Sequence, residues 1–313
     1  MKKKMGRKKK IISWLTAIVV VIAAALTAAS LYFYQVAFVP GEKSFLDSEK
    51  VTKKETAAKK WLKENKQTWK QTSAGGNLKL VAAYVPAEKP TKKTVVVAHG
   101  FMGKKEDMAQ QIKMFHDMGY NVLAPDDRAH GQSEGEVIGY GWTDKDDYAK
   151  WVNKVIAKDG TDSQIVLYGI SMGGATVMMM SGINLPSQVK AIVEDCGYSS
   201  LKDELFYEAG NLYNIPPVPL VKILSWVTIV KGGYDPYVAS SVDQLKNNHL
   251  PVFFIHGGKD DFVPTNMVYK NYKATKGPKE LWVIKGVGHA KSFEKNPQLY
   301  QNKVTKFLDK YIK

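Results

Sequence analysis

Cysteine is almost absent from this 313-residue chain, and its scarcity excludes several kinds of site. The single cysteine, Cys196, cannot form an internal disulfide, and without a CxxC pair it offers no cysteine-based zinc site. The six histidines are scattered, and no HExxH motif occurs. We therefore expect neither a bound metal nor an organic cofactor.

Acidic residues are the minority, with 30 Asp and Glu against 45 Lys and Arg, for a formal charge of +15. Seven of the basic residues precede residue 11; the remainder holds 38 basic and 30 acidic residues, or +8. No nucleic-acid-binding motif accompanies this charge. We expect no nucleic acid partner and no obligate protein partner. The basic remainder suits either an anionic cell envelope or simple solubility.

Charge is missing altogether from residues 11–39. At about 1.5 Å per residue, a helix of this length is roughly 40 Å long and can cross a hydrocarbon core of about 30 Å. The basic residues 1–10 should stay in the cytoplasm. We therefore expect a single-pass anchor in the cell membrane with the rest of the chain outside. The alternative is a signal peptide cleaved near Ala28-Ala29-Ser30, although the apolar run continues past that point.

The remaining chain divides into a connector and one domain. Residues 40–76 are polar and lysine-rich, with a helix expected over 47–70 and Trp61, Leu62 and Trp69 as packing residues. Residues 77–313 alternate between strand and helix, and runs such as TVVVA are typical of strands buried on both faces. This alternation predicts an α/β fold with a doubly wound, mostly parallel sheet. Strands are expected at 78–85, 94–98, 121–125, 164–168, 191–194, 252–256 and 281–285, and helices at 106–118, 144–158, 173–183, 265–275 and 297–312.

Residues 201–234 interrupt this rhythm with an aromatic, helical stretch that contains a Pro216-Pro217-Val218-Pro219 break. We interpret it as a small helical lid over the edge of the sheet that holds the active site. The alternative is a pair of packing helices with no gating role.

A GxSxG motif, Gly169-Ile170-Ser171-Met172-Gly173, follows the expected strand QIVLY and opens a helix. The sharp strand-to-helix turn exposes the serine hydroxyl, and the glycines leave space for the turn. The motif alone is common by chance, so its position between a strand and a helix gives it weight. Ser171 is the candidate nucleophile.

A serine nucleophile needs a base and a carboxylate that orients it, which follow the serine in this order on such folds. Asp260 and Asp261 come just after one expected strand, and His289 comes just after the next. Both loops lie where catalytic groups gather in open α/β sheets. Less favoured candidates are Asp195 for the acid and His130 for the base, and His256 is expected to be a structural hydrogen-bonding residue.

Backbone amides can stabilise the oxyanion that forms during attack. The segment His99-Gly100-Phe101-Met102-Gly103 follows the TVVVA strand, and the amides of Phe101 and Met172 are the candidate donors. We also expect His99, Gly100 and the lid residue Trp226 to contact the substrate. The aromatic lid favours an apolar acyl or aromatic group, although these side chains can equally be core.

These motifs resemble the α/β-hydrolase superfamily and, more narrowly, the membrane-bound cell-surface hydrolases of Gram-positive bacteria. The resemblance spans roughly residues 77–313. The family patterns HGxxG, GxSxG, HGxxDxxVP and GxGH match at His99, Gly169, His256 and Gly286 onward, which implies Asp260 as the acid. The DxRGHGxSxG loop matches residues 126–135, except that Ala129 replaces a glycine.

The expected activity is that of a serine hydrolase that cleaves a small-molecule or lipid-like carboxylic ester through an acyl-enzyme. The same site could serve a thioesterase, an acyltransferase or a peptidase. A different class of protein, a catalytically idle module that binds the envelope, is the remaining alternative.

Overall fold

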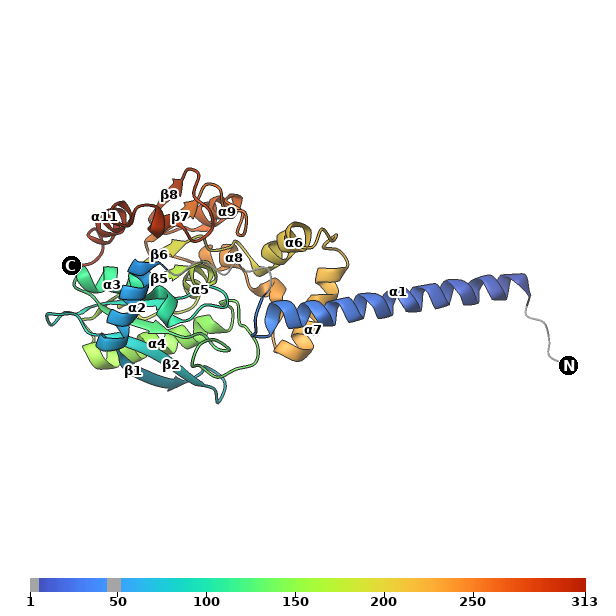
Figure 1. Cartoon of the computed structure of the whole chain (residues 1–313), viewed down its shortest axis with the longest axis horizontal. Coiled ribbons are helices and arrows are strands. Elements are labelled where there is room, and N and C mark those ends of the chain that lie inside the picture. The colour runs from blue at the N-terminus through green and yellow to red at the C-terminus, as the bar shows by residue number, and fades with distance from the viewer. Residues whose placement is uncertain (1–5, 44–51) are drawn as a thin grey trace.

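The computed structural model describes residues 6–43 and 52–313 (Figure 1). Its described part centres on one eight-stranded sheet with the order β1-β2-β4-β3-β5-β6-β7-β8. β2 is antiparallel to both of its neighbours, and the other adjacent strands are parallel. This confirms the mostly parallel α/β sheet. The strands are β1 (Gln67–Thr72), β2 (Lys79–Val85), β3 (Lys93–Ala98), β4 (Asn121–Pro125), β5 (Gln164–Ile170), β6 (Val189–Asp195), β7 (Val252–Gly257) and β8 (Lys279–Ile284).

Helices cover both faces of the sheet, as the doubly wound prediction requires. Val95 and Val97 of β3 face one layer, and Val96 between them faces the other, because successive side chains of a strand point to opposite faces. The first layer contains α2 (Lys53–Asn65), α3 (Ala109–Asp117), α10 (Ser292–Lys295) and α11 (Pro297–Leu308). The second contains α4 (Asp144–Asp159), α5 (Met172–Met180), α8 (Ser241–Leu245) and α9 (Asn266–Ala274). Short 3₁₀ turns occupy Lys105–Met108 and Pro236–Val238.

The connector differs from the prediction. Residues 47–51 of the helix expected over 47–70 lie outside the described residues, and α2 ends at Asn65. The chain then enters β1, so the helical prediction was wrong for residues 67–70. Trp69 stacks on Tyr84 of β2, with ring centroids 4.3 Å apart. The threonines and tryptophan of QTWKQT favour a strand, and this pairing extends the sheet into the connector.

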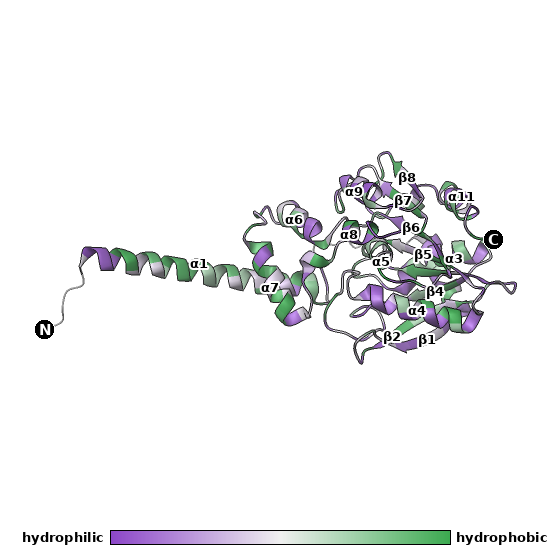
Figure 2. Ribbon diagram, turned by 180° about the vertical axis from the view of Figure 1, so that it is seen from behind, coloured by the Kyte–Doolittle hydropathy of each residue, from purple (hydrophilic) through white to green (hydrophobic). Residues whose placement is uncertain are grey.

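The N-terminal apolar segment forms α1 (Arg7–Phe38), a helix long and apolar enough to cross a membrane. It projects from the domain as a mostly hydrophobic rod (Figures 1 and 2). Its large apolar side chains from Ile11 to Ile22 are exposed. Near the domain, by contrast, Ser30, Tyr34 and Phe38 are buried, four residues apart on one helix face.

The expected lid forms α6 (Leu201–Asn211) and α7 (Leu220–Gly232), which lie beside the inner end of α1 (Figure 1). A third apolar cluster joins α1 and the lid to the top of the sheet. Within it, the ring of Phe38 contacts the rings of Tyr140 and Tyr234. The Tyr140 hydroxyl donates to the Ala37 carbonyl over 2.7 Å, and the Ile138 amide donates to the Phe38 carbonyl over 2.9 Å. The end of α1 is therefore part of the folded domain.

Candidate active site

Ser171 lies in the tight turn between β5 and α5, with φ 56° and ψ −119°. The flanking glycines are required by close packing. A side chain at Gly169 would collide with the backbone of Gly173, and one at Gly173 would collide with the backbone of Ala98. The Ser171 amide donates to the Asp195 carbonyl over 2.8 Å. The turn thus holds the serine at the carboxyl end of β5, where the motif predicted it.

Two loops bring a histidine and an aspartate to this serine. His289 Nε2 lies 2.8 Å from Ser171 Oγ, and His289 Nδ1 lies 2.8 Å from Asp260 Oδ2. Asp260 follows β7 and His289 follows β8, so each comes from a separate loop at the same edge of the sheet. The structure therefore places the three residues predicted from the sequence in one continuous hydrogen-bonded line.

Asp260 is held as an ionised carboxylate. Its Oδ1 accepts hydrogen bonds from the amides of Phe262 and Val263, at 3.0 and 2.9 Å. The buried His256 ring lies 3.2 Å from Asp260 Oδ2. Burial alone would raise the pKa of Asp260, but hydrogen bonds from His256 and His289 outweigh it and lower the pKa to about 2. His256 thus has the structural role expected for it, as a buried hydrogen-bonding partner of the acid.

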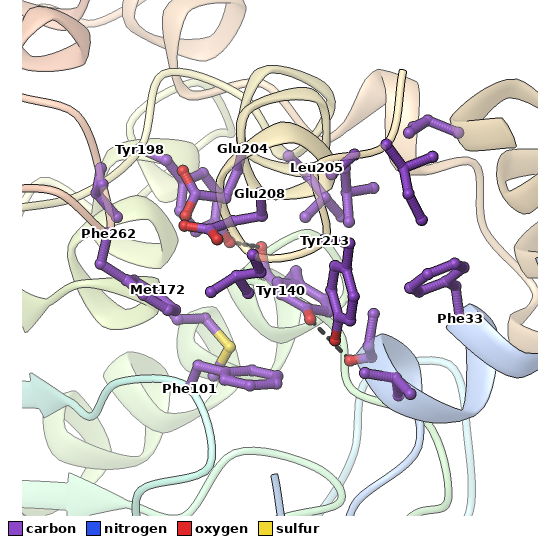
Figure 3. Close-up of a pocket in the computed structure, with 18 of the residues that line it drawn as sticks. Phe33, Phe101, Tyr140, Met172, Tyr198, Glu204, Leu205, Glu208, Tyr213 and Phe262 are labelled. Atoms are coloured by element: carbon purple, nitrogen blue, oxygen red, sulfur yellow. Dashed lines mark hydrogen bonds between the residues drawn. The ribbon is translucent and has the colours of Figure 1, made fainter. Parts of the chain in front are cut away.

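Ser171 is among the residues that line an apolar cavity of about 850 Å³, a volume that includes the open mouth. Figure 3 shows this cavity with neighbouring wall residues such as Met172 and Phe262. Its wall combines the lid, the loops at the sheet edge and the inner end of α1. The lining includes Phe33, Val36 and Ala37 of α1, Leu201, Leu205, Leu212 and Leu220 of the lid region, and Phe101, Tyr140, Met172, Tyr198 and Phe262 around the serine.

Phe101 and Met172, the residues proposed to supply the oxyanion amides, both line the cavity with Ser171. Met172 is the first residue of α5, where backbone amides have no partner within the helix. The loop that carries Phe101 is supported by His130, whose Nε2 accepts a hydrogen bond from the Met102 amide over 3.2 Å. Burial lowers the pKa of His130 to about 4, so its ring is neutral at pH 7.

Two of the three expected substrate contacts were placed wrongly. His99 is only 1% exposed, and its ring nitrogens bond the Gly100 carbonyl and the Asp127 amide, so it is a structural residue. Trp226 lies on the outer side of α7, 56% exposed and outside the residues that line the cavity. The contact at Gly100 stays a prediction; an added Cβ there would lie 3.6 Å from Ser171 Cβ.

The less favoured residues have other roles. Asp195 accepts a hydrogen bond from the Ser292 hydroxyl over 2.9 Å.

One group of side chains could in principle hold a metal ion: Cys196, Asp260 and His289 have potential ligand atoms within 4.8 Å of one another. Burial raises the pKa of the Cys196 thiol well above its usual value, which disfavours the thiolate that binds metals. The carboxylate and imidazole already bond each other, so this cluster fits a hydrogen-bonded triad better than a metal site.

Sequence reasoning missed two groups in the cavity wall. Glu204 and Glu208 of α6 both line it, and each has a buried carboxylate oxygen without a hydrogen-bond partner (Figure 3). Burial raises the pKa of Glu208 to about 7 and that of Glu204 well above its usual value. Their spacing of four residues on an expected helix is a weak signal that they share a face. The α1 residues of the wall carried no such signal.

Comparison with known proteins places this arrangement in a family. A family model described as serine aminopeptidase, S33, matches residues 89–227. The chain is 31% identical over 229 residues to the uncharacterized protein YqkD of Bacillus subtilis, covering 73% of this chain and 75% of that protein. It is 23% identical over 237 residues to a carboxylesterase of the same organism, covering 70% and 93%. The esterase Pf2001 of Pyrococcus furiosus has the same fold, with a TM-score of 0.63 and 24% identity over 81% of this chain and 95% of that one. The chain belongs to the α/β-hydrolase superfamily.

Proposed function

We propose that this protein is a membrane-anchored serine hydrolase that cleaves carboxylic esters through an acyl-enzyme. The observation that carries the proposal is the line from Ser171 through His289 to Asp260, with 2.8 Å at both steps, at the wall of an apolar cavity. This is the arrangement that a nucleophile, its general base and an orienting carboxylate require.

In the proposed reaction, His289 Nε2 accepts the proton of Ser171 Oγ as this oxygen attacks the ester carbonyl carbon. Asp260 accepts the hydrogen bond of His289 Nδ1–H, fixes the tautomer and stabilises the imidazolium. The amides of Phe101 and Met172 stabilise the oxyanion. His289 then protonates the departing alcohol, and water attacks the acyl-enzyme by the same path in reverse.

The apolar wall favours an apolar acyl chain or an aromatic acyl group. Two similar proteins bear the names carboxylesterase and esterase, which supports an ester as the substrate. Thioesters and acyl transfer to an acceptor other than water use the same residues and are resolved by substrate assays.

The test is hydrolysis of p-nitrophenyl butyrate by the full-length protein purified in detergent, with Ser171→Ala as the comparison. We expect the substitution to lower the rate by several orders of magnitude, because the nucleophile is removed. A fluorophosphonate should label the wild type at Ser171 and leave the variant unlabelled. Neither turnover nor labelling in the wild type would favour the idle envelope-binding module instead.

A second candidate is cleavage of a peptide next to a free amino terminus. Two observations favour it: the matching family model is described as a serine aminopeptidase, and Glu204 and Glu208 place two carboxyl groups in the cavity that could bind an ammonium group. Alanine p-nitroanilide in the same assay separates the two functions, because an esterase of this kind should leave it largely intact.

The proposed location is the membrane, crossed once by α1, with the hydrolase domain on the outer side. The length and apolar composition of α1 support the span. The seven basic residues before residue 11 support a cytoplasmic N-terminus.

A further inference from the structure

The helix that could cross the membrane also reaches the catalytic cavity. Phe33, Val36 and Ala37 of α1 line the same cavity as Ser171. Phe33 meets the lid residue Tyr213 edge to face, with ring centroids 4.8 Å apart (Figure 3). A membrane anchor that served only as a tether would have no need to form a wall of the active site.

The length of α1 fixes where the membrane would end. The uncharged segment starts at Ile11, and about 20 helical residues cross the hydrocarbon core, which brings the chain to Ser30. Ser30 is also the first residue of α1 that is fully buried against the domain. The cavity wall at Phe33 to Ala37 therefore begins within one or two turns of the lipid acyl chains.

The lid presents an apolar outer surface at the same level. α7 packs beside the end of α1, and it carries the exposed side chains of Trp226, Ile229 and Val230, the last 85% exposed. Exposed apolar side chains in such a cluster are typical of an interaction surface. α7 contains two lysines and no acidic residue, which suits the anionic phosphates of lipid headgroups.

We propose that the substrate is an acyl ester that resides in the bilayer, and that its acyl chain enters the cavity sideways along α1 while α7 rests on the membrane surface. The proposal rests on the proposed ester hydrolysis at Ser171 and names its substrate class. The observation that carries it is that Phe33 and Ala37, on the inner end of the apolar helix α1, line the same apolar cavity as Ser171.

The test uses full-length protein reconstituted in phosphatidylcholine–phosphatidylglycerol vesicles. Dioleoylglycerol is supplied either in the same vesicles as the enzyme or in separate vesicles, and released oleate is measured by mass spectrometry. We expect oleate release only when enzyme and ester share a bilayer. p-Nitrophenyl acetate in the water phase reports on the same serine independently.

Two substitutions test the path. Val230→Glu, outside the cavity, should lower oleate release about tenfold through the lost apolar contact with the membrane, while acetate hydrolysis is unchanged. Leu299→Glu is the matched control, since Leu299 is 42% exposed on α11, far from α1 (Figure 1), and should change neither rate. Ala37→Trp should narrow the cavity and shift the oleate-to-acetate preference against oleate. Fluorophosphonate labelling verifies that each variant has a folded site.

The outcomes separate the two proposals. Acetate turnover without oleate release, equal release from separate vesicles, or no effect of Val230→Glu would overturn lateral entry and leave the serine esterase intact. If the wild type shows neither oleate release nor acetate hydrolysis and is not labelled by the fluorophosphonate, the esterase proposal itself is overturned.

Discussion

Asp260 and Asp261 are adjacent residues with different environments, and this difference gives a test at the scale of one residue. The Asp260 carboxylate bonds His289 and two backbone amides, whereas Asp261 bonds the lid residues Tyr207 and Asn211 through its backbone carbonyl. Asp260→Asn should lower kcat on p-nitrophenyl butyrate by about 10⁴, because the amide no longer fixes the reactive tautomer. Asp261→Asn should lower kcat by less than about threefold. Similar losses in both variants would exclude Asp260 as the orienting acid.

Glu204 provides a pH-dependent test. It is 7% exposed, and burial raises its pKa well above the usual value. Above about pH 4 the unfolded side chain loses its proton while the folded one keeps it, so Glu204 lowers the free energy of unfolding progressively as pH rises.

Glu204→Gln has no proton to lose, so it should raise the unfolding midpoint above that of the wild type at pH 8, with little difference near pH 4. Thermal unfolding of the detergent-purified protein measures both. Glu88→Gln, at an exposed position, should follow the wild type at each pH. A difference between Glu204→Gln and the wild type that does not change with pH would contradict this account.

The site was predictable where its residues occur in short motifs. Ser171 and His289 each follow a strand, and the edge of a parallel sheet brings such residues together. His99 has the same position, yet its ring turns into the loop to bond the Asp127 amide, a choice that depends on the tertiary structure. Glu204 and Phe33 reach the cavity from segments whose placement no local pattern specifies.

At the scale of elements, the inner end of α1 should stabilise the domain as well as tether it. Phe38 is fully buried among Tyr34, Tyr140 and Tyr234. Phe38→Ala should lower the free energy of unfolding by about 3–5 kcal/mol, the usual cost of deleting a buried aromatic side chain. Tyr32→Ala, on a residue that is 61% exposed in the same helix, should cost less than about 0.5 kcal/mol.

Denaturant unfolding of both variants in detergent measures these costs. Equal stabilities would mean that α1 is only loosely attached and would remove the basis for a shared cavity wall.

The longer elements that followed simple periodicity were predictable, and β1, which did not follow it, was missed. The buried strands β3 and β7 contain the apolar runs TVVVA and VFFI, and α11 continues the alternation of strand and helix as far as Leu308. β1 is an edge strand with the polar sequence QTWKQT and mostly exposed side chains, so its hydrophobic pattern is weak. β1 begins at Gln67, two residues after α2 ends at Asn65, and its place in the sheet is set by its pairing with β2.

At the scale of the whole molecule, the lid and α1 lie toward one end of the long axis, and α11 and the C-terminus lie toward the other (Figures 1 and 2). Ser171 and the inner end of α1 line the same cavity. The sheet edge that carries Ser171 therefore faces the side from which α1 leaves the domain. If α1 spans the membrane, this arrangement turns the cavity toward the membrane surface. The substrates that can reach the cavity then depend on the side of the membrane on which the domain lies.

A membrane-impermeant amine reagent answers that question on intact cells. The domain carries exposed lysines such as Lys60, Lys246 and Lys285, and the N-terminal segment carries Lys8 and Lys9. The positive-inside rule predicts that reagent outside the cell modifies the domain lysines, whereas the N-terminal lysines react only after lysis. Peptide mass mapping reads both sets from one molecule, so each is the control for the other. If the domain lysines are protected in intact cells, the topology is the opposite of the one proposed. The hydrolase domain then lies on the cytoplasmic face, where only inner-leaflet esters could reach Ser171.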